Sequence, residues 1–70
     1  MTRDEHVAWC KHRALQYLDA GDLVNAVTSM GSDLNKHSET RFPPELLMRG
    51  LLDVASGNPS AVRRWIEGFN

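Results

Sequence analysis

The residues of this chain that could take part in chemistry are few, and the first candidates are His6 and Cys10. They lie four positions apart, which on a helix places both side chains on one face, as two metal ligands or a base and a thiol nucleophile would require. A closed zinc site needs four ligands in a tetrahedral array, and no cysteine and histidine cluster of suitable spacing completes such a set. Because Cys10 also falls on an apolar helix face, we expect it to be a small core residue.

No recognised catalytic motif joins the acidic residues and the histidines, and none of the five glycines belongs to a glycine-rich phosphate loop. A nucleophile needs both a base and a group that orients the base. A domain of this size also offers little room for a concave pocket. We therefore expect a noncatalytic protein, with no catalytic, metal-binding or cofactor-binding residues.

Length and charge restrict the class of protein further. Seventy residues make one domain, spanning 1–70, and a single core of that size is marginal without a disulfide, a metal or a partner subunit. One cysteine cannot form an internal disulfide and fits a reducing cytoplasm. The net charge of −1 makes the chain a poor candidate for nonspecific nucleic-acid binding. The chain has no apolar run of ~18 residues, so no membrane span is expected.

The first two expected helices meet at a tight corner formed by Gly21 and Asp22. Glycine can adopt the left-handed backbone that closes a helix, and the aspartate can accept hydrogen bonds from the first amides of the next helix. Upstream, Thr2 and Glu5 form a capping-box pattern that starts the first helix just after Thr2. Downstream, the cleanest amphipathic pattern of the chain begins at Leu23. This part of the sequence therefore predicts a helical hairpin.

A second hairpin is expected after a proline loop at residues 38–44. Pro44 can occupy the first turn of a helix over 44–55, and Asn58 can cap a helix over 59–68. The sequence therefore predicts an all-α fold, a compact four-helix domain made of two antiparallel helical hairpins. Apolar residues at helical spacing predict its core: Val7, Ala14, Leu18, Leu23, Val27, Met30, Leu34, Leu47, Leu51, Val54, Val62, Trp65 and Ile66.

Two surfaces are candidates for binding a protein partner. Trp9 lies off the apolar face of the first helix, where it can serve as an interface anchor or fold over its own helix and stack on Arg13. On the helix over 44–55, apolar residues cover nearly half of the circumference. Met48 and Leu52 on this wide face can meet a partner or be buried against the first and fourth helices together. We expect partner binding through these four residues, with self-association through the same surface as an open alternative.

The carboxyl-terminal region offers an alternative function. Residues 55–68 resemble the turn and recognition helix of phage-repressor-type helix-turn-helix proteins, in which a small-residue turn precedes a helix of the form Val-x-x-Trp-x-x-Gly. The resemblance implies that Ser60, Arg63 and Arg64 would face the major groove of DNA. The turn is one residue shorter than is usual in that family, and the chain has few basic residues for phosphate contacts. DNA binding is therefore the second hypothesis, after protein binding.

Several short segments, spread over nearly all 70 residues, carry a further resemblance. These segments are 8–11, 14–15, 17–23, 29–30, 32–34, His37, 39–40 and 61–68. On these residues the chain resembles a group of small orphan proteins encoded by tailed phages that infect actinobacteria, such as mycobacteriophages. That resemblance implies a viral protein that is expressed in the cytoplasm of a bacterial host and binds a host or phage protein. It implies no activity and no site residues.

Overall fold

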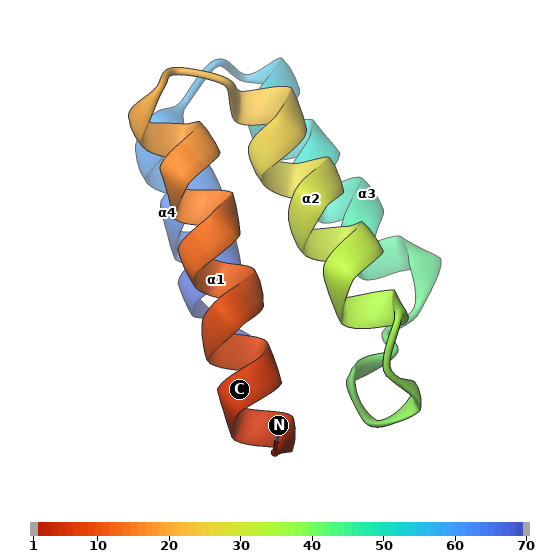
Figure 1. Ribbon diagram of the computed structural model, residues 1–70. Helices are drawn as coiled ribbons and strands as arrows, with labels where there is room; N and C mark the ends of the chain where they lie inside the picture. The colour runs from red at the N-terminus through yellow and green to blue at the C-terminus, as the bar shows by residue number, and fades with distance from the viewer. Residues whose placement is uncertain (1, 70) are drawn as a thin grey trace.

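The computed structural model describes residues 2–69, and within them the chain forms four α-helices and one short 3-10 turn. The helices pair in chain order, so that the α1–α2 hairpin packs against the α3–α4 hairpin, with α4 behind α1 and α3 behind α2 (Figure 1). The predicted all-α fold of four helices in two antiparallel hairpins is thus confirmed. The elements are α1 (Arg3–Asp19), α2 (Leu23–Asn35), η1 (Ser38–Thr40), α3 (Pro44–Ala55) and α4 (Pro59–Glu67).

The corners of both hairpins are built in the same way. A glycine with positive φ closes each first helix, Gly21 at +80° and Gly57 at +68°, a backbone region that side chains with a Cβ rarely adopt. The next residue then caps the second helix: the side chain of Asp22 accepts from the amide of Asn25, and that of Asn58 accepts from the first amides of α4. Both corners agree with the sequence prediction, because caps and turns depend on neighbouring residues alone.

The ends of α1 and α3 also follow the predicted local signals. Thr2 and Glu5 form the expected capping box, in which the Thr2 side chain accepts from the Glu5 amide and the Glu5 carboxylate accepts from the Thr2 amide. Pro44 is the first residue of α3. The loop before it contains one element that the sequence did not predict, the turn η1. Its buried Thr40 donates a hydrogen bond to the carbonyl of Leu34 and so ties the loop to the end of α2.

The core lies between α1, α2 and α4. Most of the predicted core residues are buried or partly buried, but Leu51 is 39% exposed, so its assignment to the core was wrong. The reason is that α3 packs on α2 and α4 and does not pack on α1, so its wide apolar face has no third helix to cover it. The fully or nearly fully buried apolar side chains are Val7, Cys10, Ala14, Leu18, Ala26, Val27, Met30, Leu34, Val62 and Ile66.

Glycines allow α3 to lie close to its neighbours. A Cβ on Gly50 would stand 2.8 Å from the indole ring of Trp65 and 2.9 Å from the side chain of Val27. α3 therefore sits against α4 and α2 with its own backbone at this point, a close approach that only glycine permits. None of the helices within residues 2–69 is both long enough and apolar enough to cross a membrane.

Candidate functional site

Three of the six exposed large hydrophobic side chains in residues 2–69 lie together on α3, whereas the other three, Trp9, Tyr17 and Val24, lie on α1 and α2. Met48 is 62% exposed and Leu52 is 65% exposed, and Leu51 and Ala55 are exposed beside them. These four residues follow the spacing i, i+3, i+4 and i+7, so they form one continuous apolar line along the helix, which we call the α3 stripe. The sequence left two alternatives for Met48 and Leu52, and the one in which they are buried against α1 and α4 is wrong. The other alternative, in which they remain available to a partner, agrees with the structure.

The opposite side of α3 is used for folding. Gly50 is buried against Trp65 and Val27, and Leu47 packs against Gly31 of α2. The indole Nε1 of Trp65 donates a hydrogen bond to the carbonyl oxygen of Leu46, 2.9 Å away, in the first turn of α3. Because one face holds the helix in place, the α3 stripe on the other face is presented on a rigid element.

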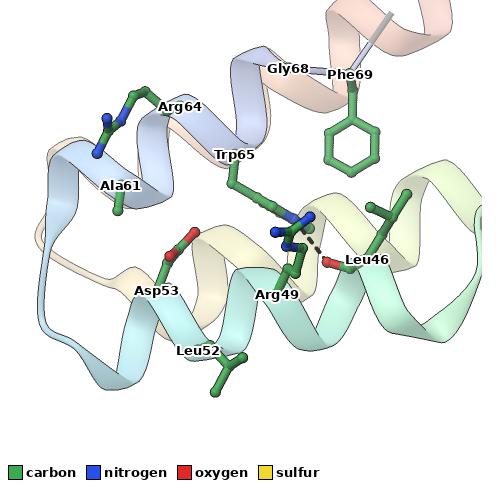
Figure 2. Close-up of a pocket in the computed structure, with 9 residues that line it drawn as sticks. All are labelled: Leu46, Arg49, Leu52, Asp53, Ala61, Arg64, Trp65, Gly68 and Phe69. Carbon is green, nitrogen blue, oxygen red and sulfur yellow. Dashed lines mark hydrogen bonds between the residues drawn. The ribbon is translucent and has the colours of Figure 1, made fainter.

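A groove runs beside the α3 stripe, between α3 and α4. It has a volume of about 560 Å³ and is lined by apolar and charged side chains from both helices, as Figure 2 shows. Trp65 and Phe69 meet edge to face in it, with ring centroids 5.0 Å apart. The lining residues are Leu46, Arg49, Leu52, Asp53, Ala61, Arg64, Trp65, Gly68 and Phe69. Leu52 therefore belongs both to the groove and to the α3 stripe.

Trp9, the other candidate anchor, is covered in part by its own helix. The Arg13 guanidinium carbon lies 4.8 Å from the centre of the indole ring, and the His6 ring stacks on it at 6.2 Å. Trp9 is 38% exposed. The stacking on Arg13 that we considered for this residue is therefore present, and Trp9 offers less free apolar surface than the α3 stripe does.

Arg13 has a second role, which the sequence did not suggest. Its Nε lies 3.1 Å from the carboxylate of Asp33, a residue of α2 that is only 2% exposed. Lys36 Nζ lies 3.3 Å from the other carboxylate oxygen, and the Ser29 hydroxyl also donates to this carboxylate. A buried carboxylate needs such partners, because leaving it without them costs far more free energy than burying an apolar group gains. Arg13 therefore links α1 to α2.

His6 and Cys10 do lie together, but their arrangement does not suit catalysis. The Nε2 atom of His6 is 3.6 Å from Cys10 Sγ and 3.0 Å from the carbonyl oxygen of Asp33. A carbonyl oxygen only accepts, so Nε2 carries the proton and cannot take one from the thiol. Burial, and then the nearby Asp33 carboxylate, raise the pKa of the Cys10 thiol, which keeps it neutral. Cys10 is fully buried, as expected of a small core residue.

Within residues 2–69, no three histidine, cysteine, aspartate or glutamate side chains lie where they could hold a metal ion together. His37 lies near His6, with ring centroids 5.5 Å apart, but its Nδ1 accepts a hydrogen bond from the amide of Glu39 in η1. The histidines of this region therefore act in local hydrogen bonding and ring packing.

The residues of the DNA-binding hypothesis do not form one basic surface. Arg63 pairs with Asp19 of α1, at 3.2 Å, and its guanidinium also lies 3.9 Å from Glu67. Arg64 lines the groove toward α3, and Ser60 lies exposed in the first turn of α4. The two arginines are thus directed to different sides of α4. Two neighbouring acidic residues offset the positive charge of Arg63, which weakens its use for phosphate contacts.

Two features of the structure could not be predicted from sequence patterns: the groove between α3 and α4, and the ion pair of the buried Asp33. The groove depends on how α3 and α4 sit on each other, and no spacing within one helix reveals that. Asp33 stands among buried apolar residues of α2, and a carboxylate at such a position is a signal that a basic partner is needed. Arg13 is that partner, but the two residues are brought together only by the turn at Gly21.

Comparison with known proteins does not extend these observations. No protein-family model, no curated protein and no solved structure matches this chain.

Proposed function

We propose that this chain is a noncatalytic protein-binding domain of phage type, which binds a host or phage protein through the α3 stripe. The observation that carries the proposal is the exposure of Met48 and Leu52 on a helix whose other face is packed. Contiguous exposed apolar surface on a small domain is typical of interaction sites. Self-association through the same stripe is the alternative within this proposal.

The α3 stripe can contribute a substantial part of the free energy of binding to a partner. Full burial of a leucine or methionine side chain contributes roughly 1.5–3 kcal/mol. Two such side chains, with Leu51 and Ala55 beside them, can therefore change a dissociation constant by a factor on the order of 100. An amphipathic helix from a partner that packs along the stripe would use the spacing of three and four residues that the stripe already has.

The test is affinity capture from bacterial lysate with matched baits. The Met48→Lys/Leu52→Lys variant places two charges on the stripe, whereas the control Ala8→Lys places a charge on an exposed position of α1, which does not pack on α3. We expect the partner to be retained by the wild type and by the control and to be lost from the α3 variant. Circular dichroism of all three baits checks that the helices are kept.

Two outcomes would count against the proposal. Equal retention of the partner by all three baits would remove the α3 stripe as its surface. Loss of the partner from a Trp9→Ala bait, with retention by the α3 variant, would place the interface on α1 instead. Trp9 and Arg13 would then be its anchors, as one of the sequence interpretations holds.

A further inference from the structure

We propose that the groove between α3 and α4 receives an acidic amphipathic helix, whose carboxylates pair with Arg49 and Arg64. This inference rests on the proposed function, because the groove adjoins the α3 stripe and shares Leu52 with it. It adds the chemistry of the partner: an apolar face for the floor of the groove, and negative charge along its margins.

The distribution of ion pairs carries the argument. Elsewhere in residues 2–69 the basic side chains of the helices are engaged: Arg3 binds Asp4, Arg13 binds Asp33, Arg63 binds Asp19, and Lys11 donates to the carbonyl of Glu67. Lys36, just after α2, also binds Asp33, whereas Arg41, in the loop before α3, has no such partner and does not line the groove. Within the same part of the chain Arg49 and Arg64 have neither an ion pair nor a hydrogen bond, although both line the groove. The groove therefore holds two unpaired cations and one carboxylate, that of Asp53, and its net positive charge favours a partner that carries negative charge.

The shape and the floor of the groove indicate a helix rather than a small anion. Leu46, Ala61, Trp65 and Phe69 give the groove an apolar lining, and the two arginines come from the two different helices that border it (Figure 2). The α3 residues that line the groove run from Leu46 to Asp53, and at 1.5 Å per residue this gives about 11 Å of groove, the length of about two helical turns. A helix laid in such a groove turns apolar residues toward the floor and polar residues toward both margins.

One acidic residue refines the expected charge pattern. Asp53 lies in the groove near Ala61, close to the turn that joins α3 and α4, and no ion pair neutralises its carboxylate within residues 2–69. It repels negative charge at that end of the groove. The partner helix should therefore carry its carboxylates opposite Arg49 and Arg64 and a neutral or basic residue opposite Asp53.

The experiment uses the full chain and two designed peptides. Both carry the same leucine and alanine face, and their polar face consists of glutamate in one and lysine in the other. Each is labelled with fluorescein, and binding is followed by fluorescence anisotropy at about 0.1 M salt, where charges a few ångströms apart still interact. We expect the glutamate peptide to bind about tenfold more tightly than the lysine peptide. The reason is that Arg49 and Arg64 attract the glutamate side chains and repel the lysine side chains.

Variants of the groove give opposite expected signs, which separates charge effects from damage to the fold. Arg49→Gln and Arg64→Gln should each weaken binding of the glutamate peptide severalfold, whereas Asp53→Asn should strengthen it. The Arg49→Glu/Arg64→Glu double variant should reverse the preference and favour the lysine peptide. General misfolding would weaken both peptides in every variant and could not produce an increase.

Three results would overturn the inference: equal binding of the two peptides, binding of neither peptide at about 1 mM, or tighter binding of a fluorescein-labelled DNA duplex than of the glutamate peptide. These failures can be told apart from failure of the proposed function. If neither peptide binds but the α3 variant still loses its captured partner, the stripe remains the binding surface and only the acidic character of the partner is wrong.

Discussion

The two hairpins of this domain have the same corner but use their apolar residues differently. Four of the buried apolar side chains come from α1 and four from α2, whereas α4 supplies two and α3 supplies none. The α1–α2 hairpin also holds the buried Asp33 and its basic partners. In the α3–α4 hairpin, apolar residues of comparable size remain on the outside. The comparison indicates that the first hairpin supplies most of the stability and that the outer apolar face of α3 is left uncovered.

Methionine occurs on both hairpins and gives the sharpest test of this difference. Met30 of α2 is fully buried, so Met30→Ala should lower the free energy of unfolding by about 2–5 kcal/mol through lost burial and a cavity. Met48 of α3 is largely exposed, so Met48→Ala should change it by no more than about 0.5 kcal/mol. Urea titration followed by circular dichroism measures both. Similar losses in the two variants would contradict the division between the hairpins.

Adding a single Cβ atom to α3 tests how closely the two hairpins pack. Gly50→Ala places a Cβ against Trp65 and Val27, and the expected loss is about 1–3 kcal/mol because rigid groups surround the site. Gly31→Ala meets the flexible end of Leu47 at 3.0 Å and the ring of Phe42 at 3.7 Å, which is an ordinary contact distance. The gain in helix propensity, up to about 1 kcal/mol, should offset that contact and leave Gly31→Ala nearly neutral. A neutral Gly50→Ala variant would show that α3 can move away from α4 at little cost.

Arg13 and Arg49 allow the two hairpins to be compared for the contribution of a charged side chain to stability. Arg13→Ala removes one partner of the buried Asp33 carboxylate and should cost about 1–2 kcal/mol, less than a fully buried pair, because the Arg13 side chain is itself partly exposed and Lys36 remains. Arg49→Ala removes a side chain with no partner in residues 2–69 and should cost less than about 0.5 kcal/mol. Thermal unfolding of the two variants measures both losses of stability. An equal effect would mean that Arg13 does not stabilise the first hairpin.

The smallest expected effect concerns the thiol in the first hairpin. Because burial and Asp33 raise the pKa of Cys10 in the folded state, its contribution to stability is fully present below the pKa of the unfolded thiol, roughly 8.5, and is lost as the pH rises through the folded value. Wild type should therefore lose more stability than Cys10→Ala between neutral pH and about pH 10. A thiol reagent should react with the folded protein only slowly at neutral pH. Rapid labelling would show an accessible thiolate and contradict this assignment.

The local features of the fold could be predicted from the sequence, and the relations between helices could not. The start of α3 at Pro44, the caps at Thr2 and Asn58 and the glycine corners all depend on residues next to one another. Leu51 was assigned to the core because its spacing matches Leu47 and Val54. Spacing gives the width of an apolar face, but the arrangement of neighbouring helices decides how much of that face is covered.

The candidate site shows the same division. Met48 and Leu52 could be named from the excess width of the apolar face on α3, and their exposure agrees with one of the two alternatives that the sequence left open. The groove and its arginines could not be named, because Arg49 and Arg64 belong to different helices and meet only across the α3–α4 contact. Asp33 was likewise missed, since its basic partner lies 20 positions away on α1.

The two tryptophans of the chain stand one on each hairpin, and this gives the domain two built-in optical reporters. Trp9 lies on α1 against Arg13, and Trp65 lies between α3 and α4 with its indole bonded to Leu46. Replacing either one by phenylalanine leaves a single emission signal that comes from one half of the molecule. If both signals change at the same temperature, the halves melt as one cooperative unit. If the Trp65 signal changes first, the α3–α4 hairpin unfolds while the α1–α2 hairpin stays folded.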